Sequence, residues 1–277
     1  MKKKQHISEL GLRILSAAAA IPIVLALTVL GGMWFQLLVL VVAALLGLEL
    51  VNNVVEERVD VIRFLTILLF LGNGILAIFG EVMTALVVGG GGAVILTGLS
   101  GLRNVKAVIF PAGIIFGSSA VVGLVVLRSD TELGLIAILW LFAVVWSADT
   151  MAYFSGRLIG GPKLAPKLSP NKTWAGFFGG IAGAAVAGLV LSRMADVGSE
   201  ITLVGLSAVA AVVAQAGDLQ QSWAKRQLGV KDSGRLLPGH GGVWDRLDAL
   251  ILVVVFAAII GVIRGSDQSL AYNLLIW

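Results

Sequence analysis

Long apolar runs separated by short polar stretches dominate this 277-residue sequence. A helix needs about 20 apolar residues to cross the hydrocarbon core of a bilayer, and nine runs approach or reach that length. They lie at about 12–31, 33–51, 62–79, 82–99, 106–127, 133–154, 173–192, 201–218 and 248–264. The pattern predicts an all-α fold, a polytopic integral membrane bundle of about nine transmembrane helices.

The placement of the cations predicts the orientation of these spans, because cytoplasmic loops are enriched in Lys and Arg. With nine spans and a cytoplasmic N-terminus, the outer segments hold only Arg128, Arg193 and Arg264 among the 20 Lys and Arg. The two long polar loops, 155–172 and 219–247, then both lie on the cytoplasmic side. We therefore expect a multi-pass membrane protein whose polar loops face the cytoplasm.

Composition supports this class. The chain is 58% hydrophobic and only 13% charged, whereas a soluble domain carries about 25% charged residues. It has no cysteine, which excludes disulfides, thiolate metal sites and a Cys nucleophile. The net charge of +4 reflects the loop cations, so no nucleic-acid partner is expected. The basic, then apolar N-terminus is similar to a signal peptide, but the many spans that follow favour a retained first helix.

Two stretches rich in glycine lie within predicted spans. The segment GGIAGAAVAG (179–188) would let neighbouring helices approach closely. GGGG at 89–92 weakens a helix, and tight packing or local unwinding explains it better than a ligand site. The chain divides into an apolar N-terminal region of about five spans (1–130) and a C-terminal region (131–277) that contains both polar loops.

Four aspartates stand at the predicted inner ends of spans in the C-terminal region. Asp149 lies near the end of the sixth span, Asp218 ends the eighth, and Asp245 and Asp248 open the ninth. A carboxylate in or near hydrocarbon is costly and is usually kept for a function or a partner. One such acid could simply sit at the interface beside a Lys or Arg, but four together favour a site. Oxygen ligands of this kind suit Mg²⁺, which is commonly held by one or two carboxylates plus substrate phosphates.

Cations, glycines and hydrogen-bonding groups accompany these acids. The turn PGHGG (238–242) would let a backbone approach a ligand and offer N–H groups to phosphate oxygens. The positive-inside rule alone accounts for the cations but not for the glycines and acids between them. Together they suit phosphoryl or nucleotidyl transfer. The polar residues are Ser169, Asn171, Lys172 and Thr173 in the first loop and Lys225, Arg226, Lys231, Arg235 and Arg246 in the second.

Other catalytic classes lack support. His240 is one of only two histidines, and a lone histidine is more often structural than catalytic. The chain has no Ser-His-Asp order, no HExxH and no GxxxxGK[ST]. It therefore lacks the motifs of a Ser-His-Asp hydrolase, a zinc protease and a P-loop NTPase.

The segment SWAKRQLGVKDSGRLLPGHGGVWDRLD (222–248) resembles the signature of the phosphatidate cytidylyltransferases, also called CDP-diacylglycerol synthases. The resemblance extends to GDLQQS (217–222), LAPKLSPNKTWAGFFGG (164–180) and SADTMAYFSGRLIG (147–160), which is roughly the C-terminal half. It implies an enzyme that converts CTP and phosphatidic acid to CDP-diacylglycerol and pyrophosphate in the inner leaflet. It also implies a need for Mg²⁺, to which a second ion such as K⁺ could be added, and a homodimer.

By position, the resemblance implies that Asp218 and Asp245 are the metal ligands. It places Lys225, Arg226, Lys231, Asp232, His240, Arg246 and Asp248 in the catalytic set. The substrate-binding positions are Asp149, Ser169, Asn171, Lys172, Thr173, Ser222, Arg235, Gly239, Gly241 and Gly242. Three positions depart from the usual pattern, Met151, Ala175 and Ala224, and none is a proposed metal ligand.

Three alternatives remain at this point. A cytidylyltransferase for another lipid phosphate, such as an archaeal ether lipid, would share the motif. An ion-coupled transporter would place its acids midway through the spans and often shows repeats, and neither feature is evident. An inactive scaffold is disfavoured because both proposed metal ligands are retained.

Overall fold

The structure is a computed structural model that describes residues 9–55, 60–234, 241–265 and 268–277, and the side chains from residue 16 onward. Within these ranges helices predominate, and one short two-stranded sheet is present. The elements in chain order are α1 (Glu9–Leu30), α2 (Gly32–Val54), α3 (Asp60–Ile78), α4 (Val82–Ser100), α5 (Lys106–Ser129), α6 (Gly134–Leu158), β1 (Lys163–Ala165), β2 (Ser169–Thr173), α7 (Trp174–Ala195), α8 (Glu200–Gln227), α9 (Trp244–Ile263) and α10 (Leu270–Leu275).

The predicted all-α polytopic fold is confirmed. Eight of the described helices, α2 to α9, are long and apolar enough to cross a membrane. Helix α1 has 22 residues, and its side chains are described from Ser16 to Leu30, an apolar segment shorter than the other spans. A ninth transmembrane span therefore stays a prediction.

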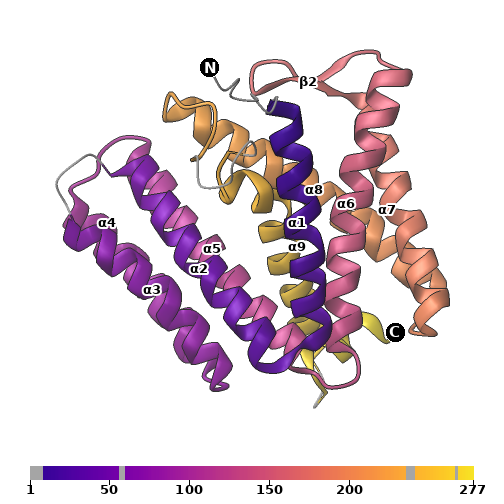
Figure 1. The fold of residues 1–277 in the computed structure, drawn as a ribbon, viewed down its shortest axis with the longest axis horizontal. Helices are drawn as coiled ribbons and strands as arrows, with labels where there is room; N and C mark the ends of the chain where they lie inside the picture. The colour runs from indigo at the N-terminus through magenta and orange to yellow at the C-terminus, as the bar shows by residue number, and fades with distance from the viewer. Residues whose placement is uncertain (1–8, 56–59, 235–240, 266–267) are drawn as a thin grey trace, which may run out of the picture.

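Helix α9 is central to the bundle and contacts α2, α5, α6 and α8. Helices α3 and α4 form one outer edge, α6 and α7 form the opposite side, and α1 crosses the middle of the view (Figure 1). Helix α9 therefore packs against both halves of the chain. Its contacts bring the N-terminal region close to the polar segments of the C-terminal region.

The predicted close packing of the small-residue segment is confirmed, and it joins α6, α7 and α8. A Cβ on Gly183 would lie 3.0 Å from the carbonyl oxygen of Ser147 on α6. A Cβ on Gly188 would lie 2.8 Å from the carbonyl oxygen of Leu203 on α8. At such distances only glycine lets the backbones approach without displacement. Helix α4 is continuous through the glycine run 89–92, and packing explains two of its four glycines: Gly89 faces Ser118 and Gly92 faces Leu69, whereas Gly90 and Gly91 face open space.

Three features of the C-terminal region differ from the sequence prediction. Helix α8 extends to Gln227, about two and a half turns beyond Asp218, where the eighth apolar run ends. Helix α6 extends to Leu158, and the following segment forms the antiparallel hairpin of β1 and β2. Hydropathy locates the apolar part of a helix, whereas the polar segment after Asp218 consists largely of residues that also favour helix. The second loop therefore begins after Gln227 and not at residue 219.

The opposite end of the bundle contains Arg128, Arg193 and Arg264, each bound within the chain. Arg128 donates to the carbonyl oxygens of Thr28 and Val29 at the turn between α1 and α2. Arg193 pairs with Glu200 at 3.0 Å, and Arg264 donates to carbonyl oxygens near the C-terminus. These contacts stabilise the connections at this end: the turn between α1 and α2, the link from α7 to α8, and the segment after α9.

Candidate active site

The polar segments gather at one end of the bundle. The hairpin of β1 and β2 and the C-terminal part of α8 lie at the same end in Figure 1. The N-terminus of α9 connects to the same region. Residues from both predicted polar loops are therefore neighbours in space.

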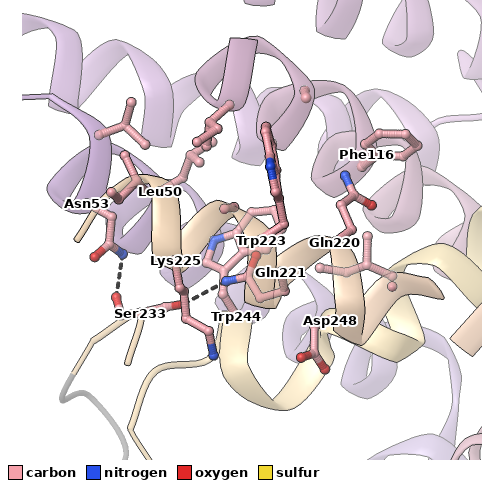
Figure 2. Close-up of a pocket in the computed structure, with 18 of the residues that line it drawn as sticks. Leu50, Asn53, Phe116, Gln220, Gln221, Trp223, Lys225, Ser233, Trp244 and Asp248 are labelled. Carbon is pink, nitrogen blue, oxygen red and sulfur yellow. Dashed lines mark hydrogen bonds between the residues drawn. The ribbon is translucent and has the colours of Figure 1, made fainter. Parts of the chain in front are cut away.

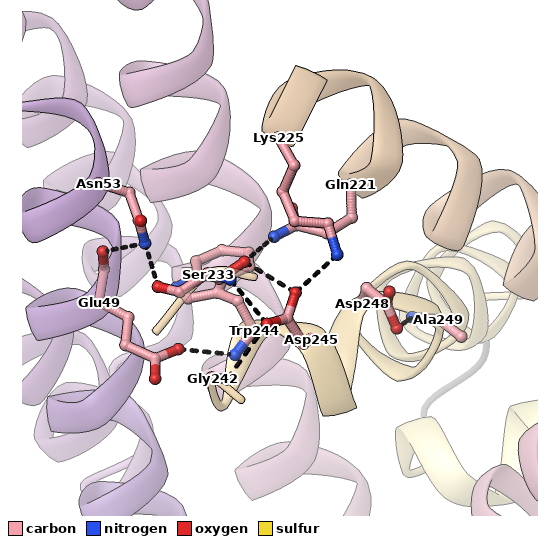
Figure 3. Close-up of polar contacts among 10 residues, drawn as sticks. All are labelled: Glu49, Asn53, Gln221, Lys225, Ser233, Gly242, Trp244, Asp245, Asp248 and Ala249. Carbon is pink, nitrogen blue, oxygen red and sulfur yellow. Dashed lines mark hydrogen bonds and ion pairs between the residues drawn. The ribbon is translucent and has the colours of Figure 1, made fainter. Parts of the chain in front are cut away.

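Asp245, in the first turn of α9, is the centre of a dense hydrogen-bond network (Figure 3). Its Oδ1 accepts from Lys225 Nζ at 2.7 Å and from the Ser233 hydroxyl at 3.0 Å. Its Oδ2 accepts from the Ser233 N–H at 2.7 Å and from the Gly242 N–H at 3.1 Å. Only 8% of the Asp245 side chain is exposed. This carboxylate therefore joins α8, the segment at Ser233 and the start of α9.

A close contact between α8 and α9 places two more acids together. A Cβ on Gly217 would lie 2.6 Å from the carbonyl oxygen of Asp248, so the helices approach at backbone level. Asp218 follows Gly217 directly. Asp218 and Asp149 both interact electrostatically with Asp248, although Asp149 comes from α6. Three carboxylates from three helices thus face one region.

Lys172 brings the hairpin to these acids, because its Nζ lies 2.6 Å from Asp218 Oδ2. The neighbouring Thr173 has a different position. Its side chain accepts from the Gly176 N–H at 3.1 Å and caps α7, and the residue is buried. An N-cap of this kind fixes where the helix begins. Lys172 thus reaches the acids, while Thr173 holds the helix that follows.

A pocket opens beside this network and is formed by both halves of the chain (Figure 2). Its lining includes Leu50 and Asn53 of α2, Phe116 of α5, Lys225 of α8 and Asp248 of α9. The volume is about 780 Å³ including the open mouth. We call it the α2–α8 pocket.

A second pocket lies between α1, α6 and α9, and we call it the α1–α6 pocket. Asp149, Asp245, Arg246 and Asp248 supply its charged groups. Asp248 therefore lines both pockets. The remaining wall of the α1–α6 pocket is largely apolar.

An entirely apolar cavity adjoins the α1–α6 pocket. The two share Val24, Phe142, Leu247 and Leu250 in their walls. Ala120, Val121 and further aliphatic side chains of α2, α5 and α9 complete the cavity. A pocket that contains charged groups thus borders a space that suits hydrocarbon.

The cytidylyltransferase family model matches residues 11–263 of this chain. The chain belongs to the cytidylyltransferase family. It is 38% identical over 267 residues to the phosphatidate cytidylyltransferase of Brucella abortus biovar 1 (strain 9-941), covering 95% of this chain and 97% of that protein. It is 46% identical over 136 residues to the protein of that name from Haemophilus influenzae, covering 46% of each chain. The family expected from the motif is confirmed.

The other predicted site residues of this family member lie around the same end. Five of them are exposed: Asn171, Arg226, Lys231, Asp232 and Arg246. Two are partly buried, Ser169 and Ser222. Gly241 has a φ of 84°, a conformation that favours glycine. Its neighbour Gly242 donates to Asp245, as described above. The predicted positions Arg235, Gly239 and His240 lie outside the described residues.

Sequence reasoning missed the contribution of α2 to this site. Glu49 accepts from the Trp244 N–H at 2.9 Å, and Asn53 donates to the Ser233 carbonyl oxygen. It also missed Gln221, whose side chain donates to the Ser233 hydroxyl at 2.7 Å. A signal was present, because Glu49 is an ionisable residue within an apolar run and such residues usually have a partner.

The acids offer a partial fit to the Mg²⁺ that the family resemblance implies. Within the described part of the chain no three His, Asp or Glu side chains form a preassembled metal cluster. Mg²⁺ does not require one, since one or two carboxylates plus substrate phosphates usually suffice. Asp218 and Asp248, at the α8–α9 contact, each have one oxygen in a described contact, to Lys172 Nζ and from the Ala249 N–H, so the other oxygen of each suits such an ion. Both oxygens of Asp245 accept protein hydrogen bonds, so its predicted role as a ligand would require some of these bonds to break.

Proposed function

We propose that this chain is a phosphatidate cytidylyltransferase, which makes CDP-diacylglycerol and pyrophosphate from CTP and phosphatidic acid in phospholipid biosynthesis. The observation that carries the proposal is the meeting of two pockets at Asp248, one of which adjoins an apolar cavity. A nucleotide and a lipid must react at one place, and such an arrangement can receive both. The activity is also the one named for relatives that match nearly the whole chain.

In this reaction an oxygen of the phosphatidate phosphate attacks the α-phosphorus of CTP. The bond from that phosphorus to the bridging oxygen breaks, and pyrophosphate leaves. The nucleophile is already anionic, so a strong general base is not needed. The main barrier is the approach of two anions, which fixed positive charges lower.

The cations of this end of the bundle suit that task. Arg226 and Lys231 are exposed beside the network and can bind phosphate oxygens of CTP. Arg246 lines the α1–α6 pocket and suits the phosphate of the lipid. Lys172 and Lys225 are paired with Asp218 and Asp245, so they orient acids and can also reach a bound anion.

We assign the lipid to the α1–α6 pocket and the adjoining apolar cavity. The phosphate would lie near Arg246, and an acyl chain would extend past Phe142 and Leu250. Burial of a chain in this cavity gains about 0.8 kcal/mol per CH₂ when the chain leaves water, and less when it leaves the bilayer. The α2–α8 pocket remains on the other side of Asp248.

Mg²⁺ would be held by Asp218 with Asp248, or with Asp245 as the family resemblance implies. When bound, Mg²⁺ supplies neutralisation of the triphosphate and of the leaving pyrophosphate. Asp149 adds negative charge to the same region and would strengthen retention of a cation. A second ion such as K⁺ and a homodimer stay proposals from the family resemblance.

The orientation proposed is an inner-membrane protein whose polar end faces the cytoplasm, where CTP is available. The distribution of cations supports it, because the three cations predicted in outer segments, Arg128, Arg193 and Arg264, lie at the end of the bundle opposite the polar segments. Reporter fusions test it: a fusion at Trp277 should read as external and one within residues 160–168 as cytoplasmic. The reverse pattern would overturn the orientation.

The activity itself is tested by offering the purified protein CTP and Mg²⁺ with phosphatidic acid, with an ether-lipid phosphate or with no lipid. Mass spectrometry of the extracted lipids should show CDP-diacylglycerol with phosphatidic acid. Product from the ether lipid alone would reassign the substrate. No cytidylylated lipid under any condition would refute the proposed function.

A further inference from the structure

Glu49 is a buried acid of α2 that the reaction described above does not use. The residue is 2% exposed and takes part in no described ion pair. Its Oε2 accepts from the Trp244 N–H at 2.9 Å, whereas its Oε1 is buried with no hydrogen-bond partner among the described residues. A carboxylate buried in this way is costly, so its retention calls for a physical reason.

The carboxylate of Glu49 lies against two glycines of the active-site segment. A Cβ on Gly234 would lie 2.6 Å from Oε1, and a Cβ on Gly242 would lie 2.7 Å from Oε2. Neither glycine has a positive φ. Backbone conformation therefore does not require glycine at either position. A side chain at Gly234 would meet Glu49, and one at Gly242 would meet Glu49 and also the Gly234 nitrogen at 2.9 Å.

Two further residues on the same face of α2, Leu46 and Asn53, contact the same segment, and Figure 3 shows the contact of Asn53. The Leu46 carbonyl oxygen accepts from Trp244 Nε1 at 2.8 Å. Asn53 Nδ2 donates to the Ser233 carbonyl oxygen and, at 2.7 Å, to the Glu49 carbonyl oxygen. Residues 46, 49 and 53 are spaced by three and four, so they form one stripe of the helix.

The stripe contacts two segments, Ser233–Gly234 and Gly242–Trp244, and the same two segments bind Asp245. The N–H groups of Ser233 and Gly242 both donate to Asp245 Oδ2. Displacement of either backbone group would move Asp245 and, with it, its ion pair to Lys225. Active-site groups displaced by about 1 Å can lose about 10²-fold in rate.

We propose that Glu49 is a positioning residue, which holds Ser233–Gly234 and Gly242–Trp244 together and thereby fixes Asp245 and Lys225 for the reaction. The inference rests on the proposed function. It assigns to the N-terminal half of the chain a direct part in building the site. The carboxylate acts as a hydrogen-bond acceptor and spacer, and it does not touch the substrates.

The first test compares Glu49→Ala with Glu49→Gln in steady-state assays of CDP-diacylglycerol formation. Glu49→Ala should lower kcat by about 10-fold to 10²-fold and leave both KM values within about threefold. Glu49→Gln keeps an acceptor of the same length and should retain most of the activity. Asn73→Ala is the matched control. The side-chain oxygen and nitrogen of Asn73 in α3 are buried with no described partner, like Glu49 Oε1, but the side chain lies against Gly89 of α4. Its kcat should be unchanged.

A double-mutant cycle tests the contact itself. Gly234→Ala adds a methyl group against Glu49 and should lower both kcat and the melting temperature. Glu49→Asp withdraws the carboxylate by one methylene, so Gly234→Ala should cost less in that background. The variants Gly234→Ala and Glu49→Asp keep the proposal testable if Glu49→Ala fails to fold. The melting temperatures test the contact even if the protein proves inactive as a cytidylyltransferase.

Four results would overturn the proposal. Wild-type kcat in Glu49→Ala would show that the site does not depend on this residue. An equal loss in Glu49→Gln would mean that the charge itself is required. An equal loss in Asn73→Ala would reduce the effect to general stability, and additive costs for Gly234→Ala and Glu49→Asp would show that the two positions are not coupled.

Discussion

Lys225 and Asp245 form an ion pair of 2.7 Å between the C-terminal part of α8 and the first turn of α9. The side chains are 19% and 8% exposed, so the pair is largely shielded from solvent. Asp218, by contrast, is 35% exposed and has one described partner, Lys172. Of the two acids implied as metal ligands, Asp245 therefore also holds several segments together, whereas Asp218 makes one described contact.

Asp245→Asn should lower stability as well as activity. The amide would leave at least one of the donors around Asp245 without an acceptor, which costs about 1–3 kcal/mol. Asp218→Asn should change the free energy of unfolding by less than about 1 kcal/mol, because partly exposed ion pairs contribute little. Chemical denaturation of the two purified variants checks the contrast. Equal stability of both variants would contradict the role assigned to the Asp245 network.

Gly217→Ala should destabilise the protein by about 1–3 kcal/mol, because the added Cβ meets the Asp248 carbonyl oxygen at 2.6 Å and the helices must separate. Gly90→Ala is the matched control within a helix of the same chain. Its Cβ meets nothing within 4 Å, so it should stabilise by about 0.5–1 kcal/mol. Thermal unfolding in detergent measures both, and a loss of stability in Gly90→Ala would contradict the packing described for α4.

Asp130, in the turn between α5 and α6, should make stability depend on pH. Partial burial opposes its ionisation, but hydrogen bonds from the Ser269 hydroxyl and the N–H groups of Leu133 and Glu132 outweigh it and lower the pKa below its ordinary value of 3.8. A lowered pKa contributes stability above the unfolded value, and this contribution is lost as pH falls through the folded value. The difference in melting temperature between wild type and Asp130→Ala should therefore be largest at pH 6 and should shrink as pH falls below 3.8. A difference independent of pH would contradict this assignment.

Ala120→Phe should shorten the apolar cavity beside the α1–α6 pocket. If an acyl chain lies there, the variant should discriminate against long-chain phosphatidic acid by about 10-fold or more relative to a short-chain substrate. The ratio of kcat/KM for the two lipids in the same preparation serves as its own control for general damage. An unchanged ratio would place the acyl chains elsewhere.

The sequence predicted the spans and most of the polar site because hydropathy and local motifs are properties of contiguous residues. Asp149, Lys172, Asp218 and Asp248 were all identified, and the structure brings them to one end of the bundle. The role of Glu49 could not be predicted, since its partner Trp244 is 195 residues away and apolar periodicity does not say which helices are neighbours. The predicted end of α8 was wrong, because hydropathy marks where a helix leaves the apolar region and the largely polar segment from Gln220 to Gln227 continues this helix.

The most direct test of the central claim follows radiolabel from the α-phosphate of CTP into lipid, with wild type and Asp218→Asn reconstituted in phosphatidate-containing bilayers with Mg²⁺. Wild type should form labelled CDP-diacylglycerol with an equal amount of pyrophosphate. Asp218→Asn should fall by about 10² or more while keeping its melting temperature. Absence of labelled lipid with wild type, or equal rates for the two proteins, would contradict the account.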